Sequence, residues 1–447
     1  MPGQGGHRIL LMPFWLCSAG YAGALLIMPS RLSDLLPAAI GTLLFALPYP
    51  HLSRWPTRPF TSSGIRLAYL VSTSLPVLLA AVFQVSGVLS SASELSYLLV
   101  TLAAVLIVSE LVGMAVANRF RASPRAAGAD RMGQLAWSVL VASIAALGLA
   151  LAGISGSPLR DSVGFAGLLR LVPLDWIPFG AVFLWLYAQH RRLRTMSGLS
   201  IVIFVLEEFL RGRKGAVFLV VLAAVITMPM RLRDTGMGLP RLRQMTTTAI
   251  LVIVGQAFFA EAASRRVARS VGFVAAVELA IERVSIVGPW ARSIRFGNLD
   301  LLRPQEIFAS TAAQLLPGAT VWFGSLGAYN AYLYLGRTEG IASTWSLPGL
   351  FSAMPGNDGI ALLWLLAWCL VASVLIARIE LFPNVWYPVA AYLSYELFVV
   401  AIISGAVDRV LAEVVTTVLA AIVFTGMPHL LTRAGPLFKV AEMSRLR

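Results

Sequence analysis

Three cations lie close together between two apolar segments of the chain. They are Arg211, Arg213 and Lys214, in the sequence LEEFLRGRKGAVFLVVLAAVI. Gly215 and the first turn of the apolar segment that follows would add free backbone N–H groups and the positive end of a helix dipole. This combination suits an anion with several oxygens, and a diphosphate would fit there. The alternative is that the three side chains are snorkelling anchors at helix ends.

Two further groups contain charges spaced four residues apart: Glu261, Arg265 and Arg269, with Arg266 beside them, and Glu278 and Glu282, next to Arg283. Residues four apart share one face of a helix. Paired carboxylates near cations are what a general base and its tuning partner need. A surface salt-bridge ladder or a solvated helix face explains both groups equally well.

Aromatic and basic side chains gather later in the chain. The aromatic ones could stack on sugar rings, although Trp and Tyr also collect at membrane interfaces. We expect the following residues to contact a substrate: Trp290, Arg292, Arg295, Trp322, Tyr329, Tyr332, Arg337, Trp345 and Arg409, with Tyr334 beside them.

The sequence offers no usable HExxH, DxD, GxSxG or Walker pattern. Its four histidines map to the N-terminus or to helix ends on the side opposite the three cations. Metal-dependent and serine-nucleophile chemistry are therefore disfavoured, and we expect no cofactor. Cys17 and Cys369 both lie in apolar segments, which supports neither a disulfide framework nor a thiolate metal site.

The elements that must position these residues are membrane helices. Hydrophobic residues make up 58% of the chain and charged residues 13%, far from the composition of an average soluble domain. Since about 20 helical residues cross the hydrocarbon core, we predict an all-α polytopic protein of about twelve transmembrane helices: Ile9–Met28, Leu35–Pro50, Ile65–Gly87, Ser96–Ala117, Leu135–Ile154, Val172–Ala188, Met196–Leu210, Gly215–Met230, Thr246–Glu261, Asp358–Arg378, Val385–Ser404 and Val410–Leu431.

The basic residues of the short loops predict the orientation of these helices. Placing both termini in the cytoplasm puts most loop arginines there, Arg54, Arg58, Arg66 and Arg191 among them. The same parity places the three cations outside, together with one long loop at about 262–357. Long loops are exempt from the charge rule, so only the cluster Arg211 to Lys214 violates it.

The long loop should carry short helices. We expect an amphipathic helix within Ser264–Val284, irregular chain over Gly288–Gln305, a second short helix at Glu306–Leu316, and an aromatic stretch at Thr320–Gly340 that lies on the membrane surface or re-enters it. We find no internal repeat and no soluble domain, so residues 1–447 should form one membrane domain. Although the net charge is +14, the cytoplasmic bases sit beside helix ends and suit lipid head groups rather than nucleic acid.

Two segments resemble a known family. GRKGA, residues 212–216, resembles the Gly-Ser-Arg-Gly-Ala turn of the oligosaccharide repeat-unit polymerases of bacterial envelopes, the O-antigen polymerase (Wzy-like) group. Here Arg213 stands in the Ser place and Lys214 in the Arg place, so the cation is kept and the hydroxyl is lost. STWSLPGLFSAMPGNDGIALLWLLAW, residues 343–368, is similar to the small-polar and Pro run that closes that group's large outer loop.

The resemblance implies a metal-independent glycosyltransferase with a GT-C-like helical bundle in the bacterial cytoplasmic (inner) membrane. It would join polyprenyl-diphosphate-linked repeat units at the outer face, releasing undecaprenyl diphosphate. Outer-face cations suit the charge on that leaving group, and Glu278 or Glu282 is the candidate base. The expected partners are the lipid-linked oligosaccharide, membrane lipids, a chain-length regulator and a flippase. The cations that we assign to the leaving group are Arg211, Arg213, Lys214, Arg265, Arg266 and Arg269.

Two other classes stay open. O-antigen ligases share this architecture, but as a family they carry a His in the large outer loop, which this chain lacks. A flippase or other transporter of lipid-linked sugars is the alternative that is not an enzyme. It would favour two similar halves and charged residues in mid-helix.

Overall fold

The structure, a computed structural model of the chain, is helical in every element of the residues it describes, which confirms the all-α prediction for them. The described residues are 4–47, 59–119, 129–151, 176–187, 190–210, 219–220, 223–224, 226–227, 273–297, 302–316, 325–335, 345–355, 358–380, 386–419 and 421–422.

The N-terminal helices form a hairpin followed by one long span. Helices α1 (Gln4–Ile27) and α2 (Leu32–Ala46) are joined by the 3-10 turn η1 (Pro29–Arg31), and the two apolar helices are bent by 118° at this break. The next span comprises α3 (Pro59–Tyr69), the π-helical turn η3 (Leu70–Ser74) and α4 (Leu75–Phe83).

Pro76 explains the π-helical turn. A proline inside a helix has no N–H to donate to the carbonyl four residues earlier, and its ring clashes with that carbonyl. The carbonyl in question belongs to Ser72, which lies in η3 near the middle of the span. The long loop supplies the missing donor, because the backbone N–H of Ile286 donates to Ser72 O at 3.1 Å.

The centre of the bundle combines the two ends of the chain. Helix α6 (Ser96–Arg119) packs against α2 and against α19 (Asp358–Ile379), and α3 packs against α20 (Trp386–Ser394) and the π-helical turn η4 (Tyr395–Val400). The first turn of α3 is held by this C-terminal part: Phe60 N donates to Glu380 at 3.1 Å, and the Ser394 hydroxyl donates to Phe60 O at 2.6 Å.

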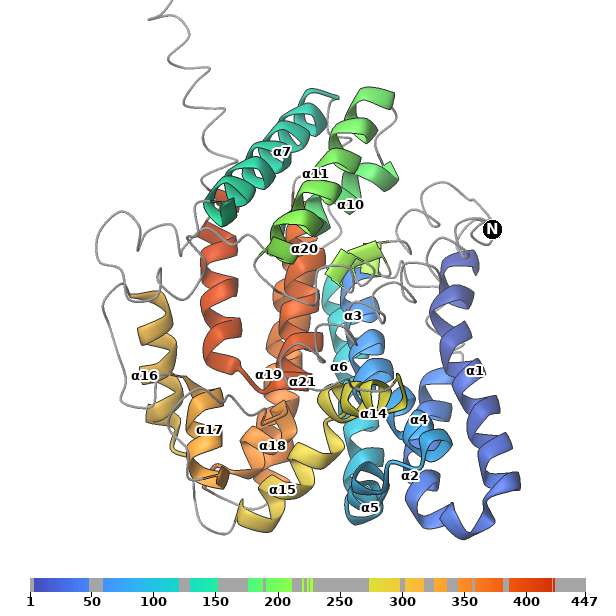
Figure 1. Cartoon of the computed structure of the whole chain (residues 1–447). Helices are drawn as coiled ribbons and strands as arrows, with labels where there is room; N and C mark the ends of the chain where they lie inside the picture. Colours follow the sequence, from blue (N-terminus) through green and yellow to red (C-terminus); the bar gives the residue numbers. More distant parts are fainter. Residues whose placement is uncertain are drawn as a thin grey trace, which may run out of the picture.

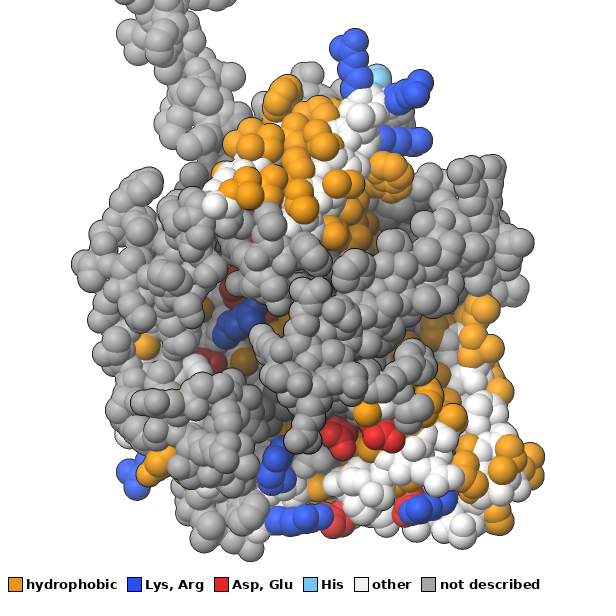
Figure 2. Space-filling view, viewed as in Figure 1, with side chains coloured by type: hydrophobic (Ala, Val, Ile, Leu, Met, Phe, Trp, Pro, Cys, Tyr) orange, Lys and Arg blue, Asp and Glu red, His pale blue; other side chains and the backbone are white. Residues whose placement is uncertain are grey.

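Three helices pack on one another beside this centre, at the top of Figure 1. They are α7 (Ala129–Leu151), α10 (Ile177–Tyr187) and α11 (Arg191–Leu210), and α10 also contacts α20. Basic side chains and a histidine gather at the top end in Figure 2, where residues 190–192 at the start of α11 are exposed.

Among the described residues, three helices are long and apolar enough to cross a membrane: Phe60–Phe83, Ser96–Ala115 and Gly359–Ile379. The pair α1 and α2 passes the same test when it is taken as one broken span. These helices match predicted segments, and helices also occupy the described parts of the predicted segments at 135–154, 172–188, 196–210, 385–404 and 410–431. The predicted segment 246–261 lies outside the described residues.

One position predicted from the charge rule is wrong. Arg66 was expected in a cytoplasmic loop, but it lies within α3 with 4% of its surface exposed. Its Nε donates to Glu110 Oε1 on α6 at 2.9 Å, its Nη1 donates to Phe45 O at 3.0 Å, and its guanidinium lies 5.8 Å from the centre of the Phe45 ring. A buried acidic partner outweighs the preference of a lone arginine for the loop.

The long loop forms helices that gather at the lower end of the bundle in Figure 1. The prediction of irregular chain at Gly288–Gln305 is wrong, because α15 runs to Gly297. Its residues at 287, 290, 291 and 294 form an apolar stripe that outweighs the neighbouring Gly and Pro. The helices of this region are α14 (Phe273–Val284), α15 (Val287–Gly297), α16 (Pro304–Leu315), α17 (Leu326–Leu335) and α18 (Leu347–Ser352), with α5 (Ser86–Glu94) packed against α15.

Candidate functional site

The cationic half of the predicted site lies outside the described residues. This applies to Arg211, Arg213, Lys214, Arg265, Arg266 and Arg269, and also to Trp322 and Arg337. The other predicted site residues belong to α14, α15 and α17, or lie at 345 and 409. Helices α15 and α17 lie at the lower end of the bundle in Figure 1, and α14 lies nearer its middle.

The two candidate bases differ in exposure. Helix α14 packs on α4, with Glu278 half-buried and Glu282 exposed. The junction that follows α14 penetrates the bundle, because Ser285 and Ile286 are 2% and 0% exposed and Ile286 N reaches Ser72. Helix α14 is therefore anchored to the middle of a candidate membrane span.

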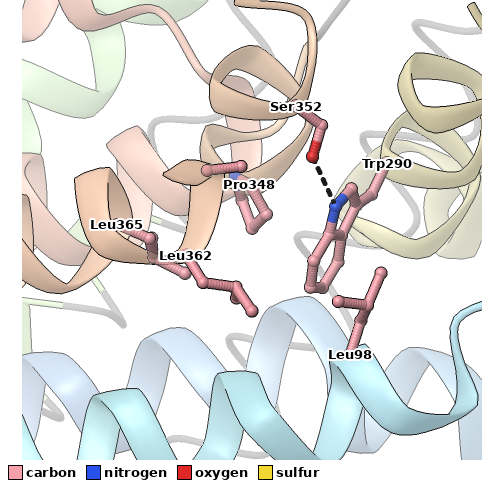
Figure 3. Close-up of a pocket in the computed structure, with 7 residues that line it drawn as sticks. Leu98, Trp290, Pro348, Ser352, Leu362 and Leu365 are labelled. Atoms are coloured by element: carbon pink, nitrogen blue, oxygen red, sulfur yellow. Dashed lines mark hydrogen bonds between the residues drawn. The ribbon is translucent and has the colours of Figure 1, made fainter. Parts of the chain in front are cut away.

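Trp290 on α15 is a packing residue in this structure. Its ring lines an apolar slot together with Leu98 of α6, Pro348 of α18 and Leu362 of α19, and its Nε1 donates to the Ser352 hydroxyl at 3.2 Å (Figure 3). The space between these side chains is too narrow for a water molecule. With 1% of its surface exposed, Trp290 lacks the open face that stacking on a sugar requires.

Arg295 is held by an acid of the neighbouring helix. Its guanidinium makes two hydrogen bonds to the Glu94 carboxylate at the end of α5, and both side chains are open to solvent. Arg31 and Asp34 form a similar pair, 3.1 Å apart, at the turn between α1 and α2. Arg292 is half-buried on α15.

A buried carboxylate organises the last helices of the loop. Asp408 is 2% exposed, and it accepts hydrogen bonds from the Ser310 hydroxyl on α16 and, at 3.2 Å, from Leu326 N at the start of α17. Trp345 also holds the start of α17, because its Nε1 donates to Leu326 O at 2.8 Å and its backbone N donates to Ser404 O at 3.1 Å. At 1% exposure Trp345, like Trp290, has no face open for stacking.

Gly405 allows its backbone to lie close to the backbone of residues 345–346. Its φ of 62° lies in the left-handed region, and a Cβ there would lie 2.6 Å from Ser346 O and 2.7 Å from Trp345 Cβ. Ser346 itself has a φ of 56°, and its hydroxyl accepts from Gly349 N at 3.2 Å at the start of α18. The close approach of two backbones fixes α18 against the bundle.

Tyr329 and Glu306 connect α17 to α16. The Tyr329 hydroxyl donates to Glu306 Oε1 at 3.2 Å, and Glu306 Oε2 accepts from Arg303 N at 2.8 Å. Burial, with a smaller contribution from the charge of Glu306, raises the pKa of Tyr329 to about 12. Tyr329 therefore donates a hydrogen bond at neutral pH and carries no charge.

The exposed side chains of this end are those that a polar ligand could reach. Tyr332 on α17 is 42% exposed, and Arg409 is exposed directly after Asp408. We call α15 to α18 together with their anchor Asp408 the outer cap, after the side on which the charge rule predicts the long loop. It presents hydroxyl, carboxylate and guanidinium groups on a rigid helical support, which suits binding of a hydroxyl-rich ligand.

Sequence reasoning missed the two buried carboxylates with the most structural consequence. Glu110 lies inside a predicted span, and an ionisable residue within a span is itself a signal of a buried partner. Asp408 lies just before the predicted segment that starts at Val410, and a charged residue in such a loop carries no signal of burial. The adjacent Gly405 marks the break between helices.

Comparison of the chain with protein-family models, with curated proteins and with solved structures found no match.

Proposed function

We propose that the chain is a polysaccharide polymerase with a GT-C-like arrangement of about twelve transmembrane helices, which joins lipid-linked oligosaccharide repeat units at the outer face of the bacterial cytoplasmic membrane. The observation that carries the proposal is the outer cap. Helices α15 and α18 of the long loop pack on one another, and hydrogen bonds of Asp408, Tyr329 and Trp345 tie in α16 and α17. The cap lies toward one end of an apolar bundle, and the exposed bases of residues 190–192 lie toward the other. By the charge rule, from which long loops are exempt, the short basic segment at residues 190–192 faces the cytoplasm and the cap faces outward.

The reaction is a transfer of a glycan from one lipid to another. A hydroxyl oxygen of the acceptor unit forms a bond to the anomeric carbon of the donor glycan, and the bond from that carbon to the diphosphate oxygen breaks. The diphosphate leaves with the electron pair, and the hydroxyl proton passes to a base. Glu278 or Glu282, both on α14, is the candidate for that base.

The cations of the sequence supply the other half of this chemistry. We assign Arg211, Arg213 and Lys214, with Arg265, Arg266 and Arg269, to the charge that develops on the departing diphosphate. In the outer cap, Tyr332 and Arg409 are the exposed groups that would bind the glycan. A chain-length regulator would act on the same outer face.

Purified protein given only a lipid-linked repeat unit should make longer lipid-linked glycans and undecaprenyl diphosphate, without metal or nucleotide. The double variant Arg213→Ala/Lys214→Ala should lose this activity by 10-fold or more for each ~1.4 kcal/mol of leaving-group stabilisation removed. Arg191→Ala/Arg192→Ala removes two exposed cations at the opposite end and should leave activity unchanged. Full-length polymer from the first variant would reject the assigned role.

A transporter of lipid-linked sugars is the second candidate. The specific observation that favours it is charge inside the bundle, since Arg66 and Glu110 lie within candidate spans and are 4% and 1% exposed. In the same assay a transporter would move the lipid across a vesicle membrane and leave the glycan length unchanged. A ligase would transfer glycan only after a second acceptor, such as a lipid A core, was added.

A further inference from the structure

A second polar region lies inside the bundle, away from the outer cap. Its side chains come from the three helices that contain candidate spans: Thr61, Ser62 and Ser63 on α3, Glu110 on α6 and Ser373 on α19. We call these five residues the polar core. All of them are buried, with Thr61, Glu110 and Ser373 at 1%, 1% and 0% exposure. The three helices pack on one another.

Gly113 marks the point where the polar core converges. A Cβ at Gly113 would lie 3.1 Å from Thr61 Cγ2 and 2.9 Å from Ser373 Cβ, so these two side chains meet over the one residue of α6 that lacks a side chain. Glu110 precedes Gly113 by three residues and therefore shares its helix face. The carboxylate and the two hydroxyls lie along one seam.

Hydrogen bonding in this seam is incomplete. Glu110 Oε1 accepts from Arg66, but Glu110 Oε2 has no hydrogen-bond partner, and neither do the hydroxyls of Thr61, Ser62, Ser63 and Ser373. Two other buried hydroxyls of the same kind of helix are paired. Ser109 donates to Val105 O at 2.8 Å, and Ser143 donates to Val139 O at 2.8 Å, each within its own helix.

We propose that the polar core is a binding site for water molecules within the membrane bundle. Buried polar groups in proteins are paired, and an unpaired one is costly. Here Glu110 lies on the helix face of Gly113, over which Thr61 and Ser373 meet, and its free carboxylate oxygen and their two hydroxyls are unpaired. Hydroxyls both donate and accept, which matches a ligand that does the same. A buried water is stable with two to four such partners. The water completes the shell of Glu110 and lets solvent protons and deuterons exchange with the seam beside the Arg66–Glu110 pair.

This inference does not depend on the proposed function, and stability tests it directly. If water fills the seam, Thr61→Val and Ser373→Ala remove partners of that water, and each should lower the melting temperature by about 2 °C or more. If the seam is dry, the same changes remove unpaired hydroxyls and should raise it. Ser109→Ala is the matched control, because its hydroxyl lies beside Glu110 but bonds within its own helix. An increase for Thr61→Val and Ser373→Ala would overturn the proposal.

Infrared spectroscopy of the purified full-length protein provides a second readout. The difference between the wild-type and Glu110→Gln spectra isolates the Glu110 carboxylate bands. We expect these bands to shift when H2O is replaced by D2O, and the shift to be lost in Ser373→Ala. Glu110 bands that do not shift in D2O would contradict a hydrated seam. A melting temperature that depends on replacing choline by Na+, and loses that dependence in Glu110→Gln, would show a cation there and overturn the assignment of water.

Discussion

The Arg66–Glu110 pair allows the strongest test of how the bundle is held together. Arg66→Met removes the charge at nearly constant length, and it leaves the buried Glu110 carboxylate without the cation that binds its Oε1 and Phe45 O without its donor. Breaking one partner of a buried pair costs about 3–5 kcal/mol because an uncompensated charge stays inside. Glu110→Leu should cost a similar amount, since Arg66 then loses its acid.

The double variant Arg66→Met/Glu110→Leu should behave differently from either single variant. With both charges gone no buried charge is left uncompensated, and replacing a buried pair by apolar residues is neutral or stabilising by about 1–4 kcal/mol. The double-mutant cycle should therefore give a coupling energy of about 6 kcal/mol or more. Equilibrium unfolding in mixed micelles, titrated with a denaturing detergent, measures each free energy.

The surface pair Arg295–Glu94 provides the matched control. Its side chains are 57% and 44% exposed, and exposed pairs couple by only about 0–1 kcal/mol. If Arg66 served only to set topology through the charge rule, substitution of Glu110 would cost little, and the Arg66–Glu110 coupling would fall to the value of the surface pair. That result would refute the buried-pair argument.

Two further predictions concern the outer cap, and a third concerns the contact between Ile286 and Ser72. Gly405→Ala should destabilise the cap, because a Cβ would lie 2.6 Å from Ser346 O at a φ of 62°; faster proteolysis of the long loop measures this, with Gly23→Ala, where a Cβ meets nothing within 4 Å, as the control. Tyr329 should ionise near pH 12 rather than 10. Because its pKa is raised in the folded state, its contribution to stability is complete below about pH 10 and is lost as the pH rises through 12. The difference between the ultraviolet titrations of wild type and Tyr329→Phe measures this pKa. Pro76→Ala should restore a donor to Ser72 O and displace Ile286, so that a cysteine at Ser285 becomes reactive toward thiol reagents; unchanged protection would contradict that reasoning.

The sequence predicted the helices because apolar runs of spanning length have few other solutions in lipid. It predicted the short helix at Glu306–Leu316 for the same kind of reason, a local apolar pattern. It failed at α15, where Gly288, Pro289 and Gly297 indicated a turn, but the stripe of Trp290 and its apolar neighbours packs against α18 and α5. Tertiary contact, which no local pattern contains, decided that segment.

The candidate site could likewise be predicted from the sequence only in part. The sequence shows which residue types occur in the long loop, but the roles of these residues depend on partners that are far away in the sequence. Trp345 reads as a surface aromatic until Leu326 O and Ser404 O are placed beside it. The structural role of Asp408 likewise depends on its hydrogen bond with Ser310, which lies on a different helix. The spacing of residues along the chain does not predict such contacts.

The hydrogen bond from Ile286 to Ser72 imposes an order on the biogenesis of the protein. Because Pro76 has no N–H, the Ser72 carbonyl enters the membrane without its usual helical donor, in a medium where an unsatisfied carbonyl is unfavourable. Its partner residue is synthesised much later, after several more segments of the chain. During that interval the first long span is incomplete. We therefore expect the span around Ser72 to reach its final hydrogen bonding only after residue 286 has been synthesised.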